Sequence, residues 1–349
     1  MPNRFMLAPL TNEQSHVDGT LSDGEHRWLT MRAEGGFGLT MTCASHVQAI
    51  GQGFAGQLGV WGDHQLPGLT RLAADIKATG SVSIVQLHHA GNRSPVELIG
   101  EAPVCPSDDP ETGARALSND EVHELVADFV AAAVRAQVAG FDGVELHGAH
   151  GYVICQFLSP ELNRRDDEYG GSLENRSRLL FEILAGVRAE CGEDFIIGVR
   201  LSPERFGMKL AEIREVTQQL IDTGEVDFMD LSLWDCFKEP EEDAWKGRPL
   251  IEIVTQIDRR EDPRGRRIPI GVAGKLHDPA DLERALEVGA DFAILGRVAI
   301  LHHDYPQRLA ADPEFVPVRP PVSRAYLENE GLTPAFVEYM NRWKGFVAD

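Results

Sequence analysis

Eight short apolar segments recur along the chain, and each is followed by a stretch with helical periodicity. They are rich in Val, Ile, Leu and Phe, as expected for parallel strands buried on both faces. Such alternation predicts an α/β fold, either a closed barrel or a doubly wound open sheet. The count of eight, and the lack of G-x-G-x-x-G after the first strand, favour a single (β/α)8 TIM barrel. The predicted strands span residues 4–10, 39–46, 82–88, 143–147, 195–201, 228–233, 268–272 and 292–295.

Helical periodicity fills the gaps between these strands, and three helix starts have recognisable caps. Ser22-x-x-Glu25 and Ser118-x-x-Glu121 have the capping-box pattern. Asp278-Pro279 places a proline in the first turn of a helix. The predicted helices span residues 22–35, 65–79, 118–139, 173–191, 210–223, 247–260, 279–288 and 298–310.

The segments outside this repeat are three long loops and a tail. The loops, residues 98–117, 155–171 and 234–248, follow strands, so we expect them on the catalytic face of the barrel. Residues 312–349 are predicted to be a C-terminal extension packed on the barrel. Residues 1–349 are therefore predicted to form one domain.

Composition excludes several classes of function. The net charge of −22 leaves no basic footprint for nucleic acid, and we expect no binding to anionic membranes either. No apolar run reaches the roughly 18 residues of a transmembrane helix, and the start of the chain lacks a signal-peptide pattern. The five cysteines are scattered without a C-x-x-C pair, which argues against disulfides, structural zinc and iron–sulfur clusters. We therefore expect a cytoplasmic protein, which could be a homo-oligomer.

The candidate catalytic residues lie where the fourth strand ends. The stretch Glu145-Leu-His147-Gly-Ala-His150-Gly-Tyr152 brings two imidazoles and a phenol within six residues. Side chains at the carboxyl end of a barrel strand point into the ligand site. Imidazole N–H groups can polarise a carbonyl, and a phenol can deliver a proton to carbon. H-x-x-H alone is weak evidence, because histidines in loops are often structural and histidines three apart can bind a metal.

The ends of other strands predict a phosphate site and two further polar residues inside the barrel mouth. Gly274 follows the seventh strand, and Gly296-Arg297 follows the eighth. Barrels often bind phosphate there, through backbone N–H groups and an arginine. Arg200 ends the apolar fifth strand and needs an anionic partner, which can be an internal carboxylate or a ligand. Gln86, in the third strand, offers both a donor and an acceptor.

With these residues in place, the chain resembles the old yellow enzyme family of FMN-dependent ene-reductases, the NADH:flavin oxidoreductase group. The resemblance covers nearly the whole chain and is most specific from His147 to Arg176. The matching segments are residues 3–11 (NRFMLAPLT), 85–91 (VQLHHAG), 147–152 (HGAHGY), 156–160 (QFLSP), 163–165 (NRR) and 167–176 (DEYGGSLENR).

The resemblance implies FMN at the barrel mouth, with NADPH or NADH as the reductant. Gln86 would then bond the pyrimidine edge of the flavin, and Arg200 would lie at N1 and stabilise the anionic reduced ring. The residues lining the isoalloxazine would be Pro9, Leu10, Thr11 and Ala44, with the Thr11 hydroxyl near the C4 carbonyl. The phosphate would be held by Gly274, Gly296 and Arg297.

The resemblance also implies the chemistry. His147 and His150 would bind the oxygen of a small-molecule substrate with an activated C=C bond, such as an enone. Flavin N5 would deliver hydride to the β-carbon, and Tyr152 would protonate the α-carbon. The alternatives are a non-catalytic flavin-binding or sensor protein, and a metal-dependent barrel hydrolase that uses His88, His89, His147 and His150. No metal site is predicted.

Several positions depart from the family pattern. Thr11 stands where some branches carry a redox-tuning cysteine. His88 stands where tryptophan or alanine is common, and it either lines the substrate pocket or is a solvated loop residue. Trp234, Phe237 and Trp245 follow the sixth strand and either shape substrate choice or simply pack the loop. The chain begins almost on its first strand, and it lacks the iron–sulfur and FAD region of dienoyl-CoA reductase relatives, which favours a one-cofactor enzyme.

Overall fold

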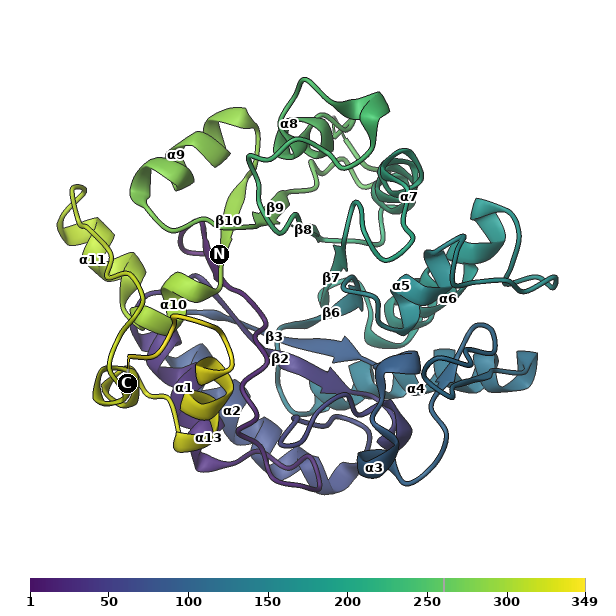
Figure 1. Ribbon diagram of the computed structural model, residues 1–349, viewed down its shortest axis with the longest axis horizontal. Coiled ribbons are helices and arrows are strands. Elements are labelled where there is room, and N and C mark those ends of the chain that lie inside the picture. The colour runs from purple at the N-terminus through teal and green to yellow at the C-terminus, as the bar shows by residue number, and fades with distance from the viewer. Residues whose placement is uncertain (260, 349) are drawn as a thin grey trace.

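The structure is a computed structural model that describes residues 1–259 and 261–348, and its centre is a closed barrel of eight parallel strands (Figure 1). This confirms the predicted (β/α)8 barrel, and the alternative of an open sheet is wrong. Around the barrel the strands follow the order β1 (Phe5–Leu7), β10 (Phe292–Leu295), β9 (Ile270–Ala273), β8 (Phe228–Ser232), β7 (Ile196–Leu201), β6 (Gly143–Gly148), β3 (Val82–His88) and β2 (Leu39–His46). The strands β4 (Val104–Cys105) and β5 (Arg115–Ala116) pair with each other outside it.

Helices surround the barrel on the outside (Figure 1). The helices that follow barrel strands are α1 (Asp23–Glu34), α2 (Leu66–Ala78), α4 (Asn119–Val138), α6 (Leu173–Cys191), α7 (Leu210–Thr223), α8 (Leu250–Thr255), α9 (Pro279–Val288), α10 (Arg297–Leu301) and α11 (Tyr305–Ala311). The sequence did not predict the short helices α3 (Val96–Ile99), α5 (Val153–Leu158), α12 (Arg324–Asn329) and α13 (Pro334–Asn341).

Two predicted helices differ from the structure. The span 298–310 is wrong as one helix, because Pro306 has no N–H for a bond to the carbonyl of His302 and the chain breaks into α10 and α11. The span 247–260 is reduced to α8, which begins after Pro249; its predicted end at residue 260 lies outside the described residues. The first strand is also shorter than predicted, since Pro9 cannot donate to the sheet.

Two of the three predicted caps form as expected. Ser118 and Glu121 complete a reciprocal capping box, and Asp278 caps α9 with Pro279 in its first turn. Ser22 caps α1, but Glu25 turns inward and accepts a hydrogen bond from Asn12 Nδ2 at 3.0 Å. Glu25 thereby ties α1 to the loop after β1.

The floor of the barrel is an apolar plug in which aromatic rings lie against glycines. A side chain on Gly198 would collide with the Phe228 ring, so this glycine makes room for it. Phe228 meets Phe292 edge to face, with ring centroids 6.1 Å apart. The plug closes one end of the barrel, which leaves the carboxyl ends of the strands as the open end.

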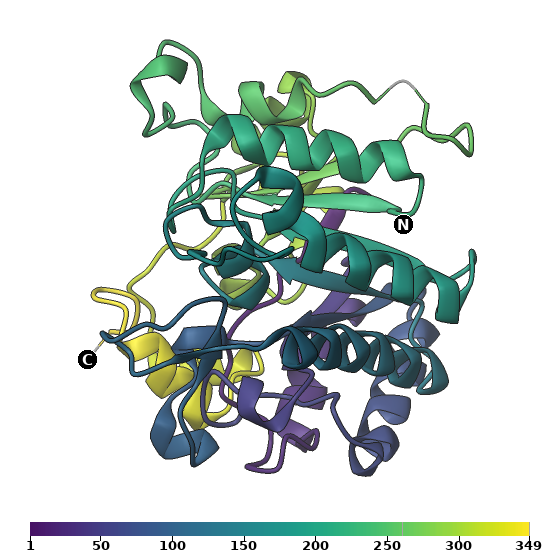
Figure 2. The ribbon, with the colours of Figure 1, turned by 90° about the vertical axis from the view of Figure 1, so that its right-hand side faces the viewer.

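The C-terminal segment lies against the loop that follows β1. Phe336 of α13 meets Trp28 of α1 edge to face, with ring centroids 4.9 Å apart. Arg342 makes two hydrogen bonds to the Glu13 carboxylate, at 2.7 and 3.0 Å. Figure 2 shows this segment on the side of the molecule opposite the N-terminus, which is the side of the loops after the strands. Residue 349, the end of the predicted extension, lies outside the described residues.

Within residues 1–259 and 261–348, we find no helix with the length and apolar character needed to cross a membrane. The described cysteines, which are all five of the chain, are free and buried.

Candidate active site

The carboxyl end of β6 places the three candidate catalytic side chains beside one another. His147 is buried near the end of the strand, and the chain then turns at His150, whose φ of 62° is left-handed. Tyr152 occupies the N-cap position of α5 without a side-chain capping bond, so the turn between β6 and α5 is short. The His147 ring centroid lies 5.1 Å from that of His150 and 5.2 Å from that of Tyr152.

His88 joins this group from β3. Its ring centroid lies 4.3 Å from that of Tyr152 and 5.5 Å from that of His147. His88 is 1% exposed, so it is not a solvated loop residue. Neither of its ring nitrogens has a hydrogen-bond partner among the described residues. Unpaired buried nitrogens beside the candidate catalytic residues are free to bind a ligand.

The three imidazoles are neutral at neutral pH. Burial is the main cause that lowers the pKa of His88, His147 and His150 well below its usual range, and neighbouring positive groups add to the effect. These groups include Arg200 and Arg93. Each ring therefore has one N–H donor and one acceptor nitrogen. The Ser232 hydroxyl lies 2.8 Å from His150 Nε2 and orients that ring.

Four buried polar side chains lie on neighbouring strands inside the barrel, and we call them the polar layer: Gln86 on β3, Glu145 on β6, Arg200 on β7 and Asp230 on β8. Gln86 Nε2 donates to Glu145 Oε1 at 2.7 Å. Arg200 Nε lies 3.1 Å from Asp230 Oδ2. Of the two partners predicted for Arg200, the structure contains the internal carboxylate, although Arg200 Nε and both Asp230 oxygens have no hydrogen-bond partner among the described residues.

The opposite side of the mouth is lined by small or apolar residues. A bulge in β2 shifts its register between Met41 and Ala44 and brings Ala44 level with Gln86. The predicted flavin-lining residues Pro9, Leu10 and Thr11 follow β1 and are half-buried. A flat ring can therefore have small side chains on one side and polar groups on the other, which fits an isoalloxazine.

The two glycine loops after β9 and β10 lie at the same end of the barrel. At Gly274, with a φ of 158°, an added Cβ would lie 3.0 Å from the backbone nitrogens of Asp235 and Cys236. At Gly296 it would lie 3.3 Å from Leu10 Cδ2. Gly274 thus lies directly against the backbone of the loop after β8, and Gly296 lies against a side chain of the loop after β1.

Arg297 is exposed and makes no hydrogen bond or ion pair with another described residue. Its backbone N–H likewise has no acceptor in the described part of the chain. The nearby Lys275 is different, because its Nζ lies 2.9 Å from Asp235 Oδ2. Arg297 is therefore the cation available to a phosphate at these loops.

The aromatic residues after β8 divide into two kinds. Trp234 is 56% exposed, and the Arg205 guanidinium lies 4.7 Å from its ring centroid. Phe237 and Trp245 instead pack on the outside of the barrel, beneath Arg284 of α9 and Arg214 of α7 respectively. Of these three aromatic residues, Trp234 alone has its side chain largely open to solvent.

The sequence did not assign several residues that the structure brings to the site. Glu145 and Asp230 complete the polar layer, and Ser232 contacts His150. Both strands beside Arg200 have a carboxyl residue, Glu145 on β6 and Asp230 on β8, so strand order alone does not show which one pairs with it. Tyr339 of α13 is close enough to Thr11 and Tyr152 for both to affect its pKa, which burial raises. No local pattern indicates that approach.

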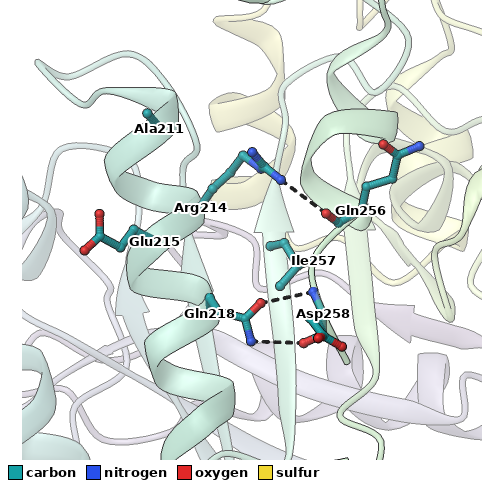
Figure 3. Close-up of a pocket in the computed structure, with 7 residues that line it drawn as sticks. All are labelled: Ala211, Arg214, Glu215, Gln218, Gln256, Ile257 and Asp258. Atoms are coloured by element: carbon teal, nitrogen blue, oxygen red, sulfur yellow. Dashed lines mark hydrogen bonds between the residues drawn. The ribbon is translucent and has the colours of Figure 1, made fainter. Parts of the chain in front are cut away.

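A surface pocket of about 320 Å³ lies elsewhere, between α7 and the segment after α8 (Figure 3). Three hydrogen bonds cross it: Arg214 to the Gln256 carbonyl at 3.2 Å, and a reciprocal pair between Gln218 and the backbone of Asp258, both at 3.0 Å. These bonds attach the segment after α8 to α7. Across the described ranges, no group of three His, Cys, Asp or Glu side chains could hold a metal ion.

Comparison with known proteins decides the family. The model of the NADH:flavin oxidoreductase / NADH oxidase family matches residues 1–314. The chain belongs to this family. The chain is 36% identical to the probable NADH-dependent flavin oxidoreductase YqiG of Bacillus subtilis, over 84% of this chain and 80% of that protein. It is 32% identical to an NADPH dehydrogenase of Listeria innocua, over 89% and 91%.

The fold of the family is found in solved structures. The old yellow enzyme homologue of Zymomonas mobilis has a TM-score of 0.80 at 27% identity, with 97% of this chain and 95% of that chain covered. Some relatives are longer: the chain spans 35% of the NADH:fumarate oxidoreductase of Klebsiella pneumoniae. As a member of this family, the protein is an NAD(P)H:flavin oxidoreductase that uses FMN.

Proposed function

We propose that the protein reduces activated C=C bonds, such as those of enones, at the mouth of the barrel. The observation that supports this most is the convergence of His147, His150 and Tyr152 on one turn, with ring centroids about 5 Å apart. Two neutral imidazoles can stabilise negative charge on a carbonyl oxygen, and a phenol can supply a proton beside them.

The residues fit FMN on three counts. Gln86 and Arg200 would hold the pyrimidine edge, and Arg297 with the two glycine loops would hold the phosphate. The small residues on the β1 and β2 side would leave room for the ring. When bound, FMN would accept hydride from NADH or NADPH and donate it to the substrate.

In the proposed reaction, Tyr152 would act as the acid. The Arg93 guanidinium lies 4.7 Å from the centroid of its ring, and Arg93 Nη1 donates to the His150 carbonyl at 2.6 Å. Arg93 therefore connects the phenol to the turn that holds the histidine. Since the imidazoles are neutral, the phenol is the stronger candidate for protonating carbon.

The first test is cofactor content together with turnover. The purified protein should be yellow, and denaturation should release FMN. Oxidation of NADH or NADPH without oxygen should require an added enone. If FMN is present but no enone, maleimide or nitroalkene supports turnover, the protein is a flavin-binding or sensor protein and the proposed reaction is wrong.

The phosphate site can be tested with Arg297→Ala. Loss of a charge-assisted hydrogen bond should raise the dissociation constant of FMN by roughly 10- to 100-fold. Riboflavin, which has no phosphate, should bind both proteins equally. Titration of the flavin-free proteins measures both constants. Lys275→Ala is the matched control, because that cation already pairs with Asp235. An equal loss of riboflavin binding would show that Arg297 does not act on the phosphate.

A further inference from the structure

The charges of the polar layer do not balance if both carboxyls are ionised. Glu145 and Asp230 are both fully buried, and Arg200 is the cation beside them. Arg200 is already paired with Asp230 at 3.1 Å. An ionised Glu145 would therefore leave one net negative charge inside the barrel, which is unfavourable in a medium of low polarity.

The hydrogen bonds of Glu145 do not compensate for such a charge. Its Oε1 accepts one bond, from the neutral amide of Gln86 at 2.7 Å. Its Oε2 is buried without a partner among the described residues. A carboxylate that remains ionised in a protein interior usually accepts several hydrogen bonds or has a cation of its own.

The titration behaviour agrees with this geometry. Burial raises the pKa of Glu145 well above its usual range, and the charge of Asp230 raises it further. Arg200 and Gln86 act in the opposite direction, but less. Burial also raises the pKa of Asp230, to about 6, while Arg200 lowers it. At neutral pH the layer then has one neutral acid, one carboxylate and one guanidinium.

We propose that Glu145 is a positioning residue, held as a neutral carboxylic acid, that fixes the Gln86 amide for the flavin. By occupying one N–H of Gln86, Glu145 leaves the other N–H and the carbonyl of the amide for the ring edge. Its neutrality keeps the polar layer free of net charge, so the positive charge of Arg200 is opposed by one carboxylate and not two. This role rests on the proposed contact of Gln86 and Arg200 with FMN.

The protonation state can be tested without reference to the flavin. An unfolded Glu145 ionises above about pH 4.5, but the folded one keeps its proton. The contribution of the protonated Glu145 to folding stability is therefore full below pH 4.5, and it decreases as the pH rises toward the pKa of the folded state. Glu145→Gln cannot ionise, and Asp230 titrates in both proteins. Above about pH 5.5 the ratio of their unfolding equilibrium constants should therefore change with pH, by up to about tenfold per pH unit, until the folded Glu145 begins to ionise. A ratio that does not depend on pH would show that Glu145 is not a neutral acid in the folded protein.

The positioning role can be tested on the FMN-loaded protein. At pH 7, Glu145→Gln should match the wild type in FMN dissociation constant and midpoint potential, because both side chains are neutral acceptors. Glu145→Leu removes the bond to Gln86 and should raise the dissociation constant about 2- to 10-fold. At alkaline pH, ionisation of Glu145 should lower the midpoint potential of the wild type below that of Glu145→Gln.

The outcomes separate the two proposals. A midpoint potential that Glu145→Gln raises already at pH 7 would show that Glu145 is charged there, and the inference fails. If the stability ratio changes as expected but neither variant affects FMN at any pH, Glu145 is a neutral acid that does not position Gln86. If the protein binds no FMN at all, the proposed function fails, while the stability result remains valid.

Discussion

Replacing Tyr152 with phenylalanine should slow the reduction of an enone by about 10²–10⁴-fold, the usual range for loss of a general acid. The phenol lies 5.2 Å from the His147 ring, measured between centroids, so it is close to any oxygen that the histidines bind. The two half-reactions can be followed separately by stopped flow. Oxidation of the reduced enzyme by the enone should slow, and reduction by NADH or NADPH should not, since that step needs no proton from Tyr152.

Quinone reduction is an internal control for this variant, because water readily protonates oxygen. Tyr169→Phe is the matched control for loss of a phenol, because Tyr169 donates to Glu182 at 2.8 Å and has no place in the site. Equal slowing of both half-reactions by Tyr152→Phe would mean that Tyr152 only shapes the pocket. An unimpaired enone step would assign the proton to another donor, such as His88 or water.

Replacing either His147 or His150 with alanine should slow enone reduction by about 10²–10³-fold, as expected when one donor to a developing oxyanion is lost. Phenols, whose phenolate anions are strong hydrogen-bond acceptors, should also bind more weakly. Both effects can be measured by steady-state kinetics and by the change in flavin absorbance on phenol titration. Since burial keeps both imidazoles neutral, their titration should not affect the rate between about pH 6 and 8.

His26→Ala is the control for loss of an imidazole, because His26 pairs with Asp75 on the outside of the barrel. Unchanged phenol affinity in both His147→Ala and His150→Ala would indicate a structural role for the pair. A rate that falls sharply as the pH rises through 6.5 would instead show that one of the rings acts as an imidazolium.

The alternation of apolar strands with helices predicted the barrel because parallel strands buried on both faces need that composition. The exceptions are local. Pro306 divides a predicted helix although the apolar pattern runs through it, and Glu25 leaves its capping box because Asn12 offers it a buried bond. In both cases, a single residue changes the structure that the local sequence pattern predicts.

The candidate site was predictable where its residues end strands. Strand ends converge in a barrel, so His147, Arg200 and Gly296 could be placed at one mouth from sequence position alone. Their roles toward FMN and substrate stay predictions. The partner of Arg200 could not be chosen from the sequence, because an internal carboxylate and an anionic ligand both satisfy a buried cation.

The sequence by itself therefore determined the architecture, the family and the strand ends that surround the mouth, since these follow from periodicity and from motifs that are contiguous in the chain. Only the tertiary structure decided which polar groups touch. The pairing of Gln86 with Glu145, and of Arg200 with Asp230, depends on strand register and on which side chains share the barrel interior. The protonation of Glu145 depends in turn on that burial and on those charges, which residues distant in the chain create together.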